Sequence, residues 1–321
     1  MSKISAGRNG PRLSAAWLER ELGVEKPVNL AEMPTLHGYK SVTPDHHGEF
    51  RFAVLNLMKS VEQAHQFPGQ NKFPQLKDWD EEERRTFLLN SGKLRDTFWK
   101  ADRLLELVDD TRQKFVDFQP PSTTAQLIAQ NRKADIDFRL FLDALLLYWK
   151  IFADTLAKLT AQLPCFKKNQ VKGDTFRLQR DWFLNKKRSA DEQYASLLET
   201  HTEWFGILAG DNHGEGLRDK IVHQPVRTEI VAYAAENPAE NMVAAIMYGT
   251  DPHRVTSLVP SIQDLLFGLF TFLDDYTVHF VRRIEEAIGG KLPGLEGRTL
   301  SLFYETEKEL PAAWLYPKID G

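Results

Sequence analysis

The sequence predicts a mainly α-helical protein, a helical bundle with a small β-hairpin inserted into it. Apolar residues recur at helical spacing over several long segments. The segment 135–163 is apolar on nearly all sides, which is typical of a helix buried at the centre of a bundle. Around residues 229–248, β-branched residues alternate on both sides of a Pro-containing turn. This pattern favours two paired strands, although the alanines there also allow a helix.

The first part of the chain divides at residue 48. Residues 1–48 are rich in Gly and Pro, and we expect a leader with one short helix, capped by Ser14 and ended by Gly23. A helical domain follows over residues 49–290, and its first helix runs from residue 49 to Pro68.

Within the helical domain, residues that end helices, mostly proline and glycine, separate the expected elements. The acidic run Asp78–Glu83 precedes a long helix from about Glu81, because acidic charge is favourable at a helix N-terminus. Pro120 and Pro164 end this helix and the central one. The remaining expected elements are a partly looped segment 166–188, a helix 190–208, a turn 210–214, a short helix cut by Pro225, the hairpin strands 229–235 and 242–248, a helix 259–288 and an irregular tail 291–321.

Composition narrows the class of protein. The single Cys165 allows no internal disulfide and no thiolate metal site of its own, and the net charge of −4 gives no overall attraction to nucleic acid. No run approaches the roughly 18 apolar residues of a membrane span. Walker, Rossmann and Gly-x-Ser-x-Gly patterns are absent from the sequence. We therefore expect a cytoplasmic protein that needs no metal, cofactor or membrane.

One local segment is strongly basic. Between Phe166 and Arg188 eight basic residues face only Asp174 and Asp181. Such a surface suits an RNA backbone, although a solvated helix face has the same composition. The aromatic residues within it are typical of core or rim positions, with base stacking as the alternative. The candidate RNA-binding residues are Lys167, Lys168, Lys172, Arg177, Arg180, Lys186, Lys187 and Arg188.

The chemistry-bearing motif is LRDKIVHQP at residues 217–225. His223 is the side chain best suited to take and return a proton near neutral pH, and the planar guanidinium of Arg218 fits phosphate oxygens. Together they form a minimal set for phosphoryl transfer on RNA. The spacing alone is weak evidence, because 20 arginines and 9 histidines give about 0.6 chance matches in this chain.

Helix geometry qualifies this site. Five residues along a helix place Arg218 and His223 roughly 140° apart around the axis, so one helix is not expected to aim both at one atom. Asp219, four residues before His223, lies on the face of the histidine and is placed to orient its imidazole. Pro225 puts His223 in the last helical turn. We therefore expect a second copy of the chain to complete the site across a two-fold axis.

The motif and the helices before it resemble the HEPN superfamily, helical-bundle proteins with an Arg-[polar]-x3–5-His motif at the end of a helix. The resemblance covers residues 130–290 and includes the segment 194–208 leading into LRDKIVH. It implies metal-independent RNA cleavage at a homodimer interface, in toxin, antiphage or stress systems with an antitoxin or regulatory protein. By motif position, Arg218 and His223 are then the catalytic pair and Asp219 the supporting polar residue.

Other interpretations of the same residues stay open. Arg218 is equally suited to a surface ion pair with Asp219, and His223 to a helix C-terminal cap. The helix then belongs to a non-enzymatic interaction module. An accessory subunit that binds RNA or a nucleotide without cleaving it is a third possibility.

Overall fold

The computed structural model describes residues 80–116, 124–185, 190–210, 215–224, 227–233, 242–248 and 255–288. This part of the chain is mainly α-helical, which confirms the predicted fold class at that level. The expected leader, the helix from residue 49 to Pro68 and the tail 291–321 lie outside the described residues. No described helix is both long enough and apolar enough to cross a bilayer.

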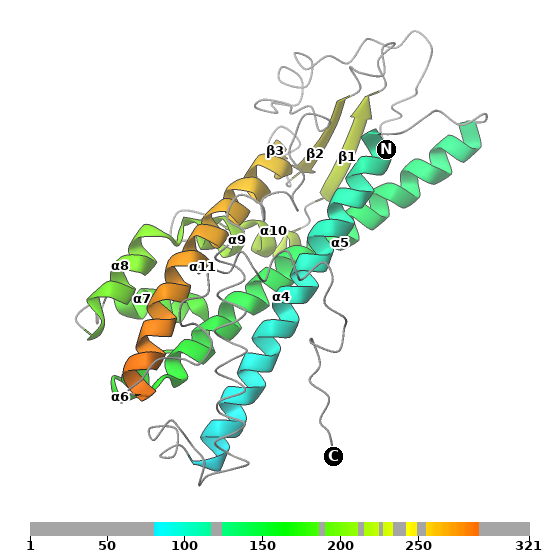
Figure 1. Ribbon diagram of the computed structural model, residues 1–321. Coiled ribbons are helices and arrows are strands. Elements are labelled where there is room, and N and C mark those ends of the chain that lie inside the picture. The colour runs from blue at the N-terminus through cyan, green and yellow to red at the C-terminus, as the bar shows by residue number, and fades with distance from the viewer. Residues whose placement is uncertain are drawn as a thin grey trace, which may run out of the picture. The chain divides into compact units, whose positions relative to one another are not determined.

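The helices are connected mostly by short segments, and a three-stranded sheet precedes the last of them (Figure 1). The elements are α4 (Glu81–Val116), α5 (Thr124–Gln162), α6 (Pro164–Lys168), α7 (Phe176–Asn185), α8 (Glu192–Thr200), α9 (Glu203–Ala209), α10 (Leu217–His223), β1 (Arg227–Tyr233), β2 (Met242–Tyr248), β3 (Val255–Ser257) and α11 (Leu258–Ile288).

The described residues belong to two compact units. Unit 1 includes residues from 102–147 and 206–265, and unit 2 includes residues from 80–101, 148–205 and 266–288. The boundaries fall inside α4, α5, α9 and α11, so each of these helices contributes to both units.

The sheet of unit 1 has the order β1-β2-β3 with antiparallel neighbours. In its first ladder Arg227 pairs with Tyr248 and Tyr233 with Met242, so all seven residues of both strands are in register. The third strand, β3, has no counterpart in the sequence prediction. It pairs Val255 with Tyr248 immediately before α11 begins.

The long helices α4 and α11 begin near the expected positions, and α4 shows why. The Glu83 amide donates to Asp80 Oδ1 at 2.7 Å, and the Asp80 amide donates to Glu83 Oε2 at 3.2 Å. This reciprocal capping box satisfies two backbone donors and places acidic charge at the positive end of the helix. The acidic run therefore serves as a helix start, as predicted.

The structure confirms one expectation about the middle of the chain and contradicts another. The segment 166–188 is partly loop, as predicted: residues 169–175 connect α6 to α7, and Phe176, Gln179 and Phe183 bury one face of α7. The expected helix 190–208 is two helices, α8 and α9, separated at His201 and Thr202. The His201 amide donates to the Leu197 carbonyl at the end of α8, the Thr202 hydroxyl donates to the Leu198 carbonyl at 2.5 Å, and the Thr202 carbonyl accepts from the Phe205 amide at the start of α9.

The core of unit 2 is aromatic. Phe98 of α4 and Phe270 of α11 both contact Trp149 of α5, with ring centroids 5.9 and 6.1 Å apart. Nearby, Phe176 of α7 contacts Trp204 and Phe272 at 5.3 and 5.7 Å. These edge and tilted contacts add to the apolar burial that holds the helices together.

The central helix α5 differs from the prediction in length and in burial. It begins at Thr124, 11 residues before the expected start at Asp135. In unit 1 only one side of it is covered: Phe138 and Leu142 are buried, whereas Leu140 is 60% exposed. A helix buried on all sides is therefore the wrong description of this half of α5.

Candidate functional site

Helix α10 is held in place by its two ends. A Cβ on Gly216, the residue before α10, would lie 2.2 Å from the Gly210 nitrogen, so the chain here requires glycine for a close backbone approach. Gly210 itself ends α9 with a φ of 75°. Glu215 and Gln224 flank α10 in the chain, and the Gln224 side chain donates a hydrogen bond to the Glu215 carboxylate. The seven-residue helix is thus fixed against the end of α9 inside unit 1.

The candidate catalytic residues meet at one nitrogen atom. Arg218 Nη1 donates to Asp219 Oδ1 at 2.7 Å and lies 3.5 Å from His223 Nε2. The side chains of Arg218 and Asp219 are 25% and 23% exposed, and His223 is exposed at the end of the helix. The guanidinium therefore sits between the carboxylate and the imidazole.

This geometry corrects the argument from helix angles. Arg218 and His223 meet within a single chain, although their Cα atoms lie far apart around the axis. Side chains of a helix lean toward its N-terminus, so the ring of His223 leans back over the turn that carries Arg218. The long arginine side chain covers the remaining gap. The angle therefore gives no reason to require a second copy.

Asp219 is bound to the arginine of the motif. Its carboxylate was expected to orient the imidazole of His223, and it accepts a hydrogen bond from Arg218 at 2.7 Å. This bond is the ion pair that the alternative interpretation anticipated. Asp219 thus acts on the guanidinium, and through it on the position of the positive charge.

Two features of this cluster bear on what it can do chemically: the hydrogen bonding of the Arg218 guanidinium and the state of the His223 imidazole. The Nε–H of Arg218 is buried and has no hydrogen-bond partner among the described residues. A buried donor left without a partner costs about 1–3 kcal/mol. Arginine only donates hydrogen bonds, so Nε2 of His223 accepts in this contact when the imidazole is neutral, with its proton on Nδ1. A fixed cation and an exposed proton acceptor therefore stand side by side.

The predicted stop of the helix is confirmed. α10 ends at His223, and Gln224 is extended with φ −113° and ψ 152°, the conformation favoured before a proline. The Gln224 amide donates to the Lys220 carbonyl at 2.9 Å and closes the last turn. His223 is consequently presented at the very end of the helix.

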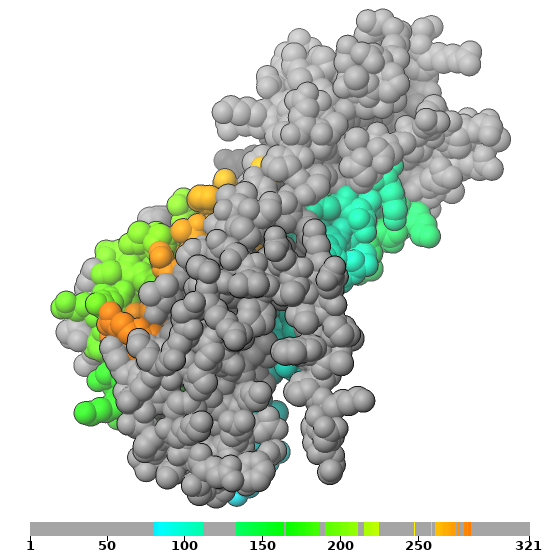
Figure 2. Space-filling model, in the orientation of Figure 1, coloured from blue at the N-terminus to red at the C-terminus, as the bar shows by residue number. Residues whose placement is uncertain are grey.

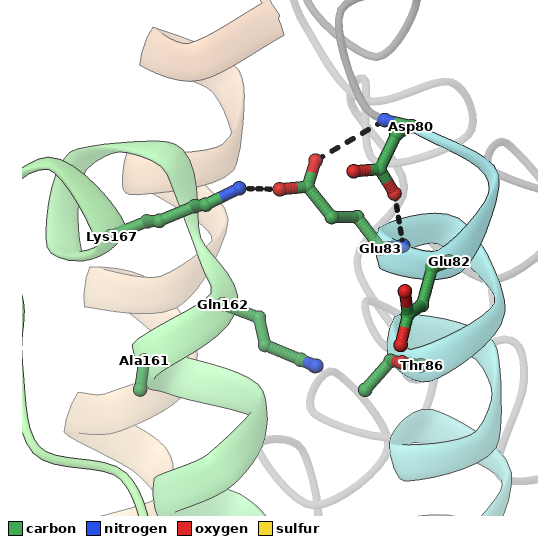
Figure 3. A pocket seen from close by; sticks show the side chains of 7 residues that line it. All are labelled: Asp80, Glu82, Glu83, Thr86, Ala161, Gln162 and Lys167. Carbon is green, nitrogen blue, oxygen red and sulfur yellow. Dashed lines mark hydrogen bonds and ion pairs between the residues drawn. The ribbon is translucent and has the colours of Figure 1, made fainter.

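The described candidate RNA-binding residues lie in unit 2, and their surroundings differ. Lys167 of α6 forms an ion pair with Glu83 of α4, beside a depression of about 320 Å³ (Figure 3). Acidic residues also line this depression, and Gln162 at its edge accepts a hydrogen bond from Asn90 at 3.2 Å. Lys167 is therefore neutralised locally, and its surroundings disfavour a phosphate.

Of the other basic residues, Lys168, Lys172 and Arg177 are exposed, and Arg180 is half-buried. Lys186, Lys187 and Arg188 lie outside the described residues. The aromatic side chains between them lie in the core or at its rim, as predicted: Phe166, Phe176 and Phe183 are buried, and Trp182 is half-buried. The three phenylalanine rings are inaccessible to a stacked base, which leaves the exposed charges as the main means of binding a nucleic-acid backbone.

A second cluster of Asp, Arg and His was missed from the sequence. Asp191, the N-cap of α8, accepts the Tyr194 amide at 3.0 Å on Oδ1. Its Oδ2 lies 2.5 Å from Arg283 Nη2 and 3.6 Å from His279 Nε2, both on α11. The His279 ring stacks on Tyr194, with centroids 5.3 Å apart. Helix-cap chemistry was a usable signal for Asp191, but nothing local in the sequence links it to residues almost ninety positions later.

Among the described residues no group of three or more His, Cys, Asp or Glu side chains is arranged to hold a metal ion. Comparisons of the chain with protein-family models, with curated proteins and with solved structures find no match.

Proposed function

We propose that this protein is an RNA endonuclease of the HEPN type that cleaves without a metal ion. The observation that carries the proposal is the shared nitrogen: Arg218 Nη1 contacts both Asp219 and His223 on an accessible helix end. The carboxylate fixes the guanidinium, and the guanidinium holds its positive charge next to the one side chain of the cluster that exchanges protons near neutral pH.

The proposed reaction uses the 2′-hydroxyl of RNA as nucleophile. His223 Nε2 takes the proton of that hydroxyl, and the 2′-oxygen forms a bond to the adjacent phosphorus. The bond from phosphorus to the 5′-oxygen breaks, and that oxygen takes a proton from the imidazolium or from water. The products are a 2′,3′-cyclic phosphate and a 5′-hydroxyl, and no water molecule is consumed in this step.

The measured contacts suit a phosphate as incoming ligand. The bond from Arg218 to Asp219 is short at 2.7 Å, whereas the contact with His223 at 3.5 Å is weak. A phosphate oxygen would replace the weak contact and leave the short one intact. Binding would therefore free Nε2 for the proton transfer while Asp219 keeps the guanidinium in position.

A second candidate function rests on the same ion pair. The bond between Arg218 and Asp219 is also what a structural surface contact looks like, so a non-enzymatic interaction or RNA-binding module remains the alternative proposal. Such a module binds a partner or RNA and gives no cleavage product.

Cleavage assays on purified protein in EDTA separate the two. We expect His223→Ala to lower the cleavage rate by at least about a hundredfold, the range of general acid–base catalysis. Arg218→Lys should also impair cleavage, because an ammonium does not reproduce the guanidinium fork. The matched control is His201→Ala, which removes a histidine whose ion pair with Asp275 lies in unit 2. Full cleavage by the His223→Ala variant would contradict the proposed activity. A wild-type protein that binds RNA and gives no cleavage product would contradict it as well.

A further inference from the structure

Two lysines from different parts of unit 2 are brought together beside the start of α7. A Cβ on Gly173 would lie 2.4 Å from the Ala161 Cβ and 3.6 Å from the Lys158 Cα, so the turn between α6 and α7 rests directly on α5. Lys172, the residue before Gly173, and Lys158 are both exposed, and green atoms of the helices α5 to α8 lie at the surface in Figure 2. Lys172 belongs to the basic segment 166–188, whereas Lys158 lies outside it and joins it only in the folded chain.

A buried amide group holds the backbone at both lysines. The Gln179 side chain of α7 is fully buried, and its Nε2 donates to the Ala157 carbonyl at 3.0 Å and to the Lys172 carbonyl at 3.1 Å. Ala157 directly precedes Lys158 in α5, so one amide group ties the helix to the turn. Gln179 Oε1 accepts the Tyr194 hydroxyl at 2.9 Å, which fixes the amide in turn. Lys158 and Lys172 therefore stand on a rigid backbone at the surface.

The charge around these two lysines is unbalanced. Neither lysine is paired with a carboxylate among the residues that the structure describes. Asp154, one turn before Lys158, is already engaged, because its Oδ1 accepts the Phe176 amide at 3.0 Å and its Oδ2 pairs with Lys150 at 2.7 Å. Apart from Lys167 with its partner Glu83, the exposed charged side chains from residue 158 to residue 185 are Lys158, Lys168, Lys172 and Arg177, against Asp174 and Asp181.

The chemistry exposed here suits the backbone of an RNA duplex. The aromatic rings of residues 158–185 are those of Phe166, Phe176 and Phe183, which are buried, and Trp182, which is half-buried. Single strands are held largely by bases that stack on exposed rings. A duplex keeps its bases stacked inside and offers its phosphates and 2′-hydroxyls on the outside. Ammonium groups on a rigid backbone match those phosphates and read no sequence.

We propose that Lys158 and Lys172 form a phosphate-binding surface for the backbone of an RNA duplex. It is a second RNA-binding site, because it lies in unit 2 and contains no residue of α10. Its role is to hold duplex RNA without regard to base sequence. The choice of RNA as the partner rests on the proposed function, whereas the choice of phosphate rests on the two lysines and their surroundings.

Fluorescence anisotropy of the full chain with a 2′-O-methylated RNA duplex tests the proposal, because this probe has no 2′-hydroxyl that could attack the phosphate. Lys158→Ala and Lys172→Ala should each raise Kd about three- to tenfold and reduce the slope of log Kd against log salt concentration by about one. The matched control is Lys100→Ala, which removes an exposed lysine of α4 that pairs with Asp96 at 2.6 Å. It should leave affinity and slope unchanged. Unchanged binding in both test variants, or an equal loss in the control, would overturn the proposal.

Two further probes decide what the surface binds. A 2′-O-methylated single strand without self-complementarity should bind more weakly than the duplex, and vesicles containing phosphatidylserine should not bind. Tighter binding of the single strand, or vesicle binding that the two lysine variants lose while the duplex stays unbound, would overturn the duplex as the partner.

The outcome is separable from that of the cleavage assay. A wild-type protein that binds the duplex through Lys158 and Lys172 but cuts no RNA contradicts the proposed function and supports this surface. A wild-type protein that cuts RNA and binds the duplex equally well without either lysine contradicts this surface alone.

Discussion

Two clusters in this protein contain the same three residue types in different surroundings. In unit 1, Asp219, Arg218 and His223 lie on one short helix and reach solvent. In unit 2, Asp191 is 6% exposed and His279 is 9% exposed, and both lie among aromatic side chains. Arg283 completes that second cluster. Composition alone therefore does not distinguish a cluster that reaches solvent from a buried one.

Burial decides the difference. A buried carboxylate must be matched by donors, and both oxygens of Asp191 have them: the Tyr194 amide on Oδ1 and Arg283 on Oδ2. The cluster joins the start of α8 to α11 and contributes to stability. In α10, by contrast, the side chains of Arg218 and Asp219 keep about a quarter of their surface in solvent, so water screens their ion pair more than it screens the pair of Asp191 and Arg283.

The largest effect should follow from removing the buried carboxylate. Asp191→Ala deletes the N-cap of α8 and leaves Arg283 and His279 without their shared anion. We expect the free energy of unfolding to fall by about 3 kcal/mol, with a lower midpoint in urea. At urea concentrations low enough to leave the variant folded, its rate of RNA cleavage should equal that of wild type.

The control is Asp275→Ala, which removes the 55% exposed partner of His201 at 2.8 Å. An exposed pair of this kind contributes about 0–1 kcal/mol. Equal losses of stability in Asp191→Ala and Asp275→Ala would contradict the distinction between the two surroundings.

The two clusters also show what a sequence can and cannot predict. Arg218, Asp219 and His223 lie within six positions, so a motif search finds them and even the helix end at His223 is predicted correctly. Asp191 and His279 meet only because α8 packs on α11, and no local pattern encodes that contact. What failed inside the motif was the direction of long side chains, since an angle between Cα positions does not fix where a guanidinium ends.

The fold divides in the same way. The start of α4 was predicted well, because the capping box of Asp80 and Glu83 is a local pattern. Features that depend on packing were not. The break between α8 and α9 at His201 and Thr202 has no glycine or proline to mark it, and the exposed Leu140 looks in the sequence like any core leucine of a central helix.

An intermediate effect is expected at alkaline pH in the buried cluster. Burial raises the pKa of Tyr194 above its ordinary value, and burial likewise raises the pKa of Tyr276. The unfolded chain therefore loses these protons first, near pH 10, and gains stability relative to the folded one. We expect the free energy of unfolding to fall above about pH 10 by about 1.4 kcal/mol per pH unit for each of these tyrosines.

Tyr194→Phe isolates one of the two contributions. At neutral pH the variant should lose about 1 kcal/mol, because the Tyr194 hydroxyl no longer donates to Gln179 Oε1 at 2.9 Å. Above about pH 10 the difference between variant and wild type should shrink, since only wild type still has that proton to lose on unfolding. Urea denaturation at several pH values measures this, and parallel pH profiles for the two proteins would exclude a buried neutral Tyr194.

The smallest effect on stability, and the sharpest test of the exposed cluster, is Asp219→Ala. Its ion pair with Arg218 is partly solvated, so the free energy of unfolding should change by less than about 0.5 kcal/mol. Cleavage should nevertheless fall about ten- to a hundredfold, because the guanidinium is no longer held in place. Combining this change with Arg218→Lys separates the two roles of Asp219. If the carboxylate acts through Arg218, Asp219→Ala should lower kcat/KM little further in the Arg218→Lys background. An equal loss in both backgrounds would contradict the geometry in which Arg218 stands between the other two residues, because Asp219 would then act on His223 directly.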